Sequence, residues 1–127
     1  MLTRPIDAAD APRAAGGYAQ AIEVAGATRL LFVSGQIPVD AEGATPSDFA
    51  GQARQAWANL EAQLRAGGMG LDNLVKVTIF LADRAHAAEN RAVRNAVLAG
   101  RQAALTVIIT GIFDPEWLLE IEAVAAA

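Results

Sequence analysis

The side chains of this chain that could do chemistry are mostly carboxylates and hydroxyls. Residues Leu118 to Val124 alternate between apolar and polar types, so Glu120 and Glu122 share one face of an expected strand. A carboxylate in such a place can hold a water molecule or exchange a proton with a bound substrate. It is also the ordinary occupant of a solvated strand face, and the alternation alone does not distinguish the two roles.

Two hydroxyl side chains, those of Tyr18 and Ser34, fall within short strand-like segments. Either group can donate and accept a hydrogen bond, so either could bind a substrate or a water molecule. Gly35 follows Ser34 directly and would let a backbone amide come close to a ligand. The commoner roles are structural: a half-buried strand tyrosine, and a serine in the turn that ends a strand.

The chain has no cysteine and a single histidine, His86. Thiol nucleophiles, disulfides and cysteine-ligated metals are therefore excluded. A lone imidazole is a poor basis for a zinc site, so we expect no metal and place His86 on a helix surface. The glycine-rich stretch Gly67-Gly68-Met69-Gly70 follows a helical pattern, and we interpret it as a helix stop and not as a phosphate loop.

Two amphipathic helices are expected to position these groups. Thr45 is predicted to cap the first helix, with a proline in its first turn and Asp48 three residues after the cap. Apolar residues then recur three or four apart as far as Leu64. The second helix is predicted from a cap at Asp83 to about Leu98, with a glycine closing it.

Strands account for most of the remaining chain. They are expected at Tyr18–Val24, Arg29–Ser34, Leu74–Leu81, Leu105–Thr110 and Leu118–Val124, with a further one near residues 2 to 6. The first two of these segments, separated by Ala25-Gly26-Ala27, are predicted to form a hairpin. The order ββαβαββ predicts an α/β (α+β) architecture: one domain, residues 1–127, with a mixed sheet covered on one face by two helices.

Composition narrows the classes of partner. Hydrophobic residues make up 54% of the chain and the net charge is -4, which is typical of a compact protein and unfavourable for phosphate backbones or anionic membranes. Arg91, Arg94 and Arg101 recur at near-helical spacing, but no aromatic residues interleave, so we interpret them as a solvated helix face and expect no nucleic acid partner. No apolar run could span a bilayer, and no secretion signal is recognisable, so a soluble, cytoplasmic protein is expected.

Four segments, in order, resemble the RidA/YjgF family. Gly16-Gly17-Tyr18-Ala19-Gln20-Ala21 is similar to the family's Gly-Pro-Tyr-x-Gln segment, with glycine in place of proline. Val33-Ser34-Gly35-Gln36-Ile37-Pro38-Val39 contains the family's Ser-Gly-Gln-Ile-Pro signature unchanged. The central strand, Asn73 to Asp83, and the C-terminal strand, Leu119 to Ala125, fit as well. Together these segments span nearly the whole chain, which is thereby identified as a member of the family.

The resemblance implies a chorismate-mutase-like fold with about six strands. It also implies a homotrimer whose sheets face inward and whose small-molecule clefts lie between subunits. Family members typically hydrolyse 2-imino or 2-enamino acids to 2-oxo acids and ammonia, without a metal or organic cofactor. An alanine-rich chain would gain from burying more surface by association, and this composition is compatible with a trimer.

The resemblance also assigns residues to the site. Glu120 matches the family glutamate that orients water, whereas Glu122 is interpreted as structural, paired with an arginine. Tyr18, Ser34 and Gly35 correspond to cleft residues. Asn90 matches the family's helix asparagine if one residue is deleted before it, although the aromatic residues expected after that asparagine are absent.

The main departure from the family is at residue 105. The family's Pro-Ala-Arg-Ser/Thr segment falls on Ala103-Ala104-Leu105-Thr106, so leucine stands where the carboxylate-binding arginine is expected. Leu105, Thr106 and Val107 are therefore assigned to a substrate-binding segment that has lost its charge-assisted hydrogen bonds. Arg101 could compensate only if the loop before Leu105 folds differently, and a surface role near a helix end is its ordinary one.

Three functions follow as hypotheses. The first is a hydrolytic deaminase of reactive imine or enamine metabolites, of weak or altered specificity, with Glu120 orienting water. The second is a non-catalytic trimer that binds a small metabolite, because Leu105 replaces the arginine. The third is a ribonuclease or translation inhibitor, a description that some relatives carry, and the acidity of the chain argues against it.

Overall fold

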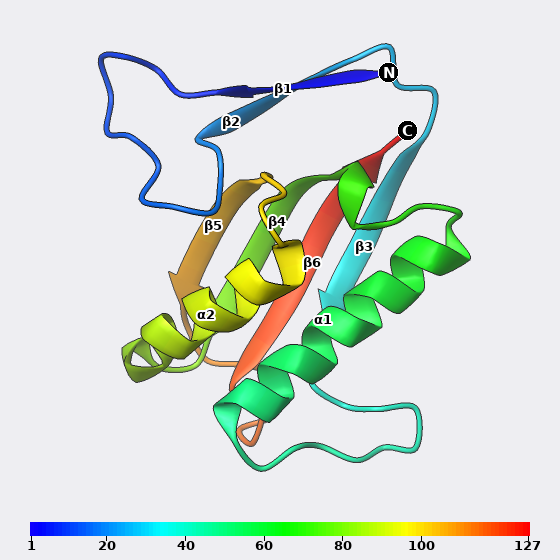
Figure 1. The fold of residues 1–127 in the computed structure, drawn as a ribbon. Coiled ribbons are helices and arrows are strands. Elements are labelled where there is room, and N and C mark those ends of the chain that lie inside the picture. Colours follow the sequence, from blue (N-terminus) through cyan, green and yellow to red (C-terminus); the bar gives the residue numbers. More distant parts are fainter.

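A four-stranded mixed sheet, two α-helices and a separate two-stranded ribbon make up the computed structural model, which describes residues 1–127 (Figure 1). The strands are β1 (Leu2–Ile6), β2 (Ala21–Ala25), β3 (Leu30–Gln36), β4 (Leu74–Leu81), β5 (Ala104–Ile109) and β6 (Leu119–Ala126), and the helices are α1 (Phe49–Ala66) and α2 (Ala87–Leu98). The predicted fold class, an α+β, chorismate-mutase-like fold with six strands and two helices, is confirmed.

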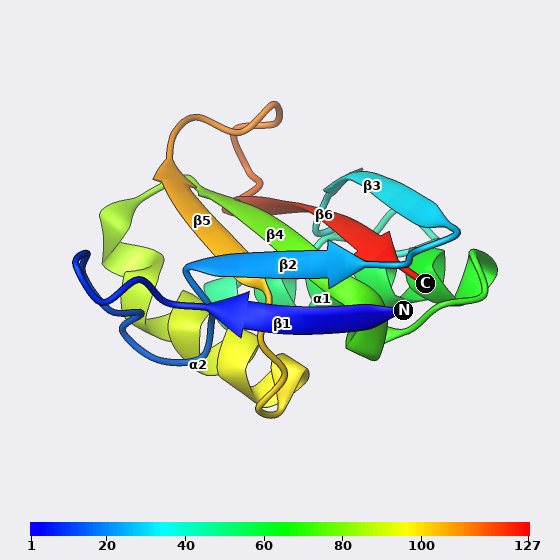
Figure 2. The ribbon, with the colours of Figure 1, turned by 90° about the horizontal axis from the view of Figure 1, so that it is seen from above.

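The main sheet has the strand order β3-β6-β4-β5. Strand β6 pairs antiparallel with both β3 and β4, whereas β4 and β5 are parallel, because α2 carries the chain back across the sheet between them. Both helices lie on the same face of the sheet, and β1 and β2 run across one end of it (Figure 2). Strands β3 and β5 are therefore the two edges.

The predicted hairpin between Tyr18–Val24 and Arg29–Ser34 is wrong. Strand β2 starts at Ala21 and pairs with β1, whereas β3 pairs with β6. The physical reason is burial: Val33 of β3 belongs to the main core, and the alternating residues of β3 can reach that core only from within the main sheet. Tyr18 lies before β2 and outside any strand.

Helix α1 supplies the largest side chains of the core. Trp57, Leu60 and Leu64 are fully buried at helical spacing, on a helix that packs against β3 and β6. The predicted cap at Thr45 is wrong by three residues. Asp48 is the N-cap, and its carboxylate accepts a hydrogen bond from the Gly51 amide at 3.0 Å, so the preceding residues remain in a loop.

Helix α2 begins after a short 3₁₀ turn. The Asp83 carboxylate accepts a hydrogen bond from the Ala85 backbone amide at 2.8 Å and so caps this turn at the predicted position. The α-helix itself starts at Ala87. His86, at the junction, is half-buried and its ring stacks on Phe49 with centroids 4.6 Å apart, so it packs against α1 instead of standing on an open helix surface. No helix is long and apolar enough to cross a membrane.

Candidate functional site

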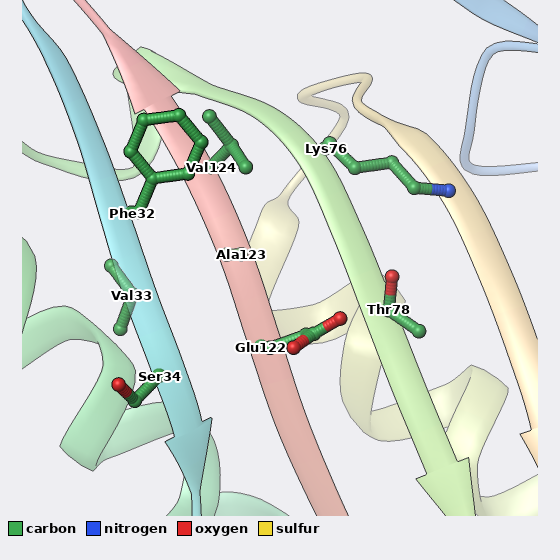
Figure 3. A pocket seen from close by; sticks show the side chains of 8 residues that line it. All are labelled: Phe32, Val33, Ser34, Lys76, Thr78, Glu122, Ala123 and Val124. Atoms are coloured by element: carbon green, nitrogen blue, oxygen red, sulfur yellow. The ribbon is translucent and has the colours of Figure 1, made fainter.

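The face of the main sheet that the helices leave open carries a cavity of about 300 Å³ (Figure 3). Strands β3, β4 and β6 supply its lining, which consists of Phe32, Val33, Ser34, Lys76, Thr78, Glu122, Ala123 and Val124. The lining combines hydroxyl, ammonium and carboxylate groups with apolar side chains, as sites for small polar molecules do.

Strand pairing explains why these polar groups gather. Thr78 of β4 lies opposite Glu122 of β6, and the Glu122 carboxylate points towards Thr78 (Figure 3). The Lys76 ammonium group donates to the Thr106 hydroxyl of β5 at 2.6 Å. Within the subunit no arginine pairs with Glu122, so the expected ion pair is absent and the carboxylate remains open on this face.

Glu120 and Gly35 lie against each other at the end of β3. The pairing of β3 with β6 is irregular between Val33 and Gln36, and Gly35 sits in that irregularity. A Cβ atom on Gly35 would come within 2.7 Å of the Glu120 carboxyl carbon, closer than van der Waals contact permits. The half-buried Glu120 side chain therefore occupies the space that a glycine leaves, and it has no ion-pair partner in the subunit.

Strand β5 places its predicted binding residues on two faces. Leu105 lies beside Val77, which is fully buried, and Leu105 packs against the main core. Thr106 lies beside Thr78 and reaches the open face, where Lys76 contacts it. Val107 is on the same side of the strand as Leu105 but is 40% exposed, because β5 is an edge strand.

Tyr18 and Asn90 stand apart from Glu120 in the subunit. Ala19, next to Tyr18, bridges to Ala104 of β5, whereas Glu120 lies beside Gly35 of β3, on the opposite edge of the sheet. The Tyr18 hydroxyl accepts from the Ala15 amide at 3.3 Å. Asn90, on α2, is only 3% exposed, and its side-chain oxygen has no hydrogen-bond partner.

The arginines of α2 and the following loop do not form one solvated face. Arg91 is exposed, but Arg94 is 4% exposed, so the interpretation of Arg94 as a surface cation is wrong. The signal that identifies it is the spacing of Asn90, Arg94 and Leu98, which share the buried side of the helix. Arg101 pairs with Asp72 and donates to the Leu98 carbonyl, so it holds the end of α2.

The side chains offer little for a metal ion. No group of three histidine, cysteine, aspartate or glutamate side chains lies close enough together to bind one. The polar groups that line the open-face cavity are the Glu122 carboxylate, the Ser34 and Thr78 hydroxyls and the Lys76 ammonium group, whereas Glu120, held against Gly35, is not part of that lining. Such a set can hold water and hydrogen-bond a small polar molecule.

Comparison with known sequences gives one family. The family described as Endoribonuclease L-PSP matches residues 8–127. The RutC family protein PH0854 of Pyrococcus horikoshii is 33% identical over 91% of both chains, and protein DfrA of Myxococcus xanthus is 32% identical over 100% of this chain and 98% of its own.

Shorter matches include proteins of named activity. The 2-iminobutanoate/2-iminopropanoate deaminase of Escherichia coli is 36% identical over 65% of this chain and 62% of its own length. The RutC family proteins of Pasteurella multocida and Haemophilus influenzae are each 39% identical over the same shares. This chain thus spans less than two thirds of the length of these relatives.

Solved structures match along the whole chain. The Rid family protein YyfB of Yersinia pestis, described as of unknown function, superposes with a TM-score of 0.86 at 27% identity and 100% coverage of both chains. The Escherichia coli protein TdcF, solved with bound serine, superposes with a TM-score of 0.74 at 29% identity and 98% coverage of both chains.

Proposed function

Because this chain belongs to the RidA/YjgF family, the family described as Endoribonuclease L-PSP, we propose that it is a hydrolytic deaminase of reactive imine or enamine metabolites. A relative named for the deamination of 2-iminobutanoate and 2-iminopropanoate supports this class of reaction. No metal or organic cofactor takes part in the proposed chemistry.

The observation that carries the proposal is the close approach of Glu120 to Gly35. A carboxylate set in the space left by a glycine is held in position without being neutralised by a cation of the subunit. A carboxylate so placed can accept a hydrogen bond from water and take up its proton. Ser34, which precedes Gly35 in the chain, is exposed and belongs to the lining of the open-face cavity.

The reaction requires addition and then elimination. Glu120 orients a water molecule towards the C=N carbon, and the water oxygen bonds to that carbon while the nitrogen is protonated. The resulting tetrahedral carbinolamine then loses ammonia, and the water oxygen becomes the carbonyl oxygen. Water is consumed and one ammonia is released for each carbonyl product, so holding the two reactants together is the main demand on the protein.

A second copy of the chain would complete the cleft. Glu120 lies on inner strand β6, against edge strand β3, whereas Tyr18 lies beside β5 at the other edge, so β4 and β5 stand between the two side chains in one subunit. Association of copies edge to edge would bring the Tyr18 side of one subunit against the Glu120 side of the next. We propose a homotrimer, with the sheet faces that the helices leave open turned inward.

The second candidate function is a trimer that binds a small metabolite without catalysis. Leu105 favours it, because this side chain packs against the core and gives a substrate carboxylate no charge. A ribonuclease is less favoured, since the net charge of -4 repels a phosphate backbone.

Replacement of the carboxylate tests the deaminase. Glu120→Gln keeps the size of the side chain but removes its basicity, so we expect ammonia release from enzymatically generated 2-iminobutanoate to fall about 100-fold. Glu42→Gln, in an exposed loop, is the matched control and should retain the original rate. Circular dichroism and thermal melting of both variants verify that the fold is kept.

The outcomes separate the candidates. A large loss confined to Glu120→Gln supports a catalytic carboxylate. Undiminished ammonia release in a folded Glu120→Gln protein removes Glu120 from the mechanism. If neither the original protein nor either variant accelerates the reaction on any imine tested, the binding trimer becomes the better description.

A further inference from the structure

Arg94, on the buried side of α2, is a cation without a counter-charge. Its side chain is 4% exposed, and none of the ion pairs of the subunit includes it. Withdrawing a charged group from water without pairing it is costly, so a buried guanidinium of this kind is rare unless something pairs with it. Burial, and secondarily the charge of neighbouring Arg91, lowers the pKa of Arg94.

The hydrogen bonds of Arg94 are as incomplete as its charge pairing. A guanidinium has five N–H donors. Here Nη2 has two acceptors, the Gly16 carbonyl at 3.4 Å and the Asn95 side-chain oxygen at 3.5 Å, both beyond the usual range for N–H···O bonds. The Nε atom has no partner at all. The remaining neighbour is the Tyr18 ring, whose centroid lies 5.9 Å from the guanidinium carbon.

Asn90, one turn earlier on the same side of α2, has the opposite deficit. Its side-chain oxygen is a buried acceptor without a donor, whereas Arg94 is a set of buried donors without adequate acceptors. A single ligand that carries a carboxylate next to an N–H group would satisfy both. Imino acids and amino acids have a carboxylate and an N–H group on adjacent carbons. Compounds in which the carboxylate is replaced by a neutral group do not.

A cavity of about 200 Å³ is lined by residues that contact Arg94, although neither Arg94 nor Asn90 belongs to its lining. Gly16 and Tyr18, which both contact Arg94, belong to its lining, together with Asp7, Arg13, Ala14, Gly17 and Gln102. The Asp7 carboxylate accepts a hydrogen bond from the Gln20 backbone amide and forms no ion pair with Arg94. Gly16 and Gly17, which line the cavity, have φ values of 98° and 77°, a conformation that favours glycine, and the Gly16 carbonyl also contacts the guanidinium.

We propose that Arg94, and not residue 105, receives the carboxylate of the ligand, with Asn90 accepting a hydrogen bond from the ligand nitrogen. The carboxylate displaces the weakly bound Gly16 carbonyl, and the glycine turn accommodates the exchange. Arg94 is thus a substrate-binding residue at the Tyr18 side of the cleft. The identity of the substrate class rests on the proposed function. It also explains how a chain with leucine at position 105 can retain a site for an acid.

Calorimetric titration of the full chain tests the assignment without any turnover. The probes are 2-oxobutanoate, its neutral amide 2-oxobutanamide, and inorganic phosphate. We expect 2-oxobutanoate to bind at least about tenfold more tightly than either of the others, as a charge-assisted pair requires. Arg94→Met should weaken 2-oxobutanoate binding at least about tenfold and leave the amide unaffected, whereas Arg91→Met, an exposed arginine on the same helix, should stay within about twofold of the original.

Thermal melting of the free protein provides an independent measurement. If Arg94 is unpaired when no ligand is bound, Arg94→Met removes a buried charge and should raise the unfolding temperature, while 2-oxobutanoate stabilises only the original protein. A lower unfolding temperature with unchanged 2-oxobutanoate affinity would show a structural arginine and overturn the proposal. Should Arg94→Met not fold, Arg94→Lys, which keeps the charge but not the forked donors, must still weaken binding of the acid.

Three further results would also overturn the proposal. The first is that 2-oxobutanoate does not bind at millimolar concentration, and the second is that inorganic phosphate binds as tightly as 2-oxobutanoate. The third is a change of assembly mass in Arg94→Met, which would indicate that a carboxylate of a second copy is the partner of Arg94. The two proposals can fail independently. The deaminase proposal is tested by the rate of ammonia release in Glu120→Gln, whereas the Arg94 site is tested by binding affinity alone.

Discussion

At the scale of single residues, the site depends on an absent side chain as much as on those present. Gly35 is needed because its neighbour across the sheet is a carboxylate and not because its backbone is unusual, since its φ is not positive. The Ser-Gly pair at the end of β3 is thus a packing requirement set by Glu120. A sequence signature of this kind has a direct geometric cause.

Gly35→Ala tests this cause. The added methyl group would collide with the Glu120 carboxylate, so we expect unfolding to become easier by about 1–3 kcal/mol, as for other overpacked sites, and ammonia release to fall with displacement of the carboxylate. Denaturant unfolding and the imine assay measure the two effects. Gly111→Ala is the control, because an added Cβ there meets no atom and φ is not positive. Equal stability of the two variants would refute the packing argument.

Leu105 leads to a second prediction. Restoring the family arginine by Leu105→Arg would place a guanidinium on the core side of β5, beside Val77. We expect a loss of about 2 kcal/mol in unfolding free energy and no gain in ammonia release. Thr106→Arg directs the same group to the open face and should be tolerated better. An active, stable Leu105→Arg protein would show that residue 105 can face the ligand.

At the scale of elements, the positions of α1, β4 and β6 could be predicted from periodicity, because each buries one regular stripe against a single core. The partner of β2 could not, since the pairing depends on β1 and on the path of β3 into the main sheet. The same limit applies to the site. Local motifs identify Ser34 and Gly35, but the contacts of Lys76 with Thr106 and of Arg94 with Tyr18 depend on tertiary packing.

The start of α1 shows how a loop competes with a cap. Thr45 has a suitable side chain and a proline behind it, but the Pro46 carbonyl accepts from the Gln52 side chain at 3.0 Å, and this keeps residue 46 in the loop. Gln52 also donates to the Glu116 carbonyl and accepts from the Leu118 amide. The helix therefore begins where these tertiary contacts allow, at Asp48.

Asp48→Ala should consequently cost more than Thr45→Ala. We expect about 1 kcal/mol of unfolding free energy for the loss of the hydrogen bond from the Gly51 amide, and a change within about 0.5 kcal/mol for Thr45, which is exposed. Urea titration of both variants measures the difference. The reverse order would place the cap at Thr45 in solution.

At the scale of the whole molecule, the two faces of the sheet are unequal. The helices bury one face. On the other face Phe32 is 72% exposed, and it lines the same cavity as Lys76 and Glu122. Ile108, on edge strand β5, is also 40% exposed. Exposed apolar groups around polar ones on a sheet face are typical of a surface that a partner covers.

The last prediction concerns the partner, which we propose to be two further copies of the chain. Multi-angle light scattering at micromolar concentration should give about 40 kDa, three times the 13.2 kDa of one chain. Phe32→Glu places a charge on the open face and should shift the mass towards one chain. It should also lower ammonia release, because the proposed cleft needs the Tyr18 side of a neighbouring copy. Ala62→Glu, exposed on α1, adds the same charge on the helix side and should leave the trimer intact. A monomer of full activity would separate the chemistry from the assembly, and Glu120 would then have to act without Tyr18.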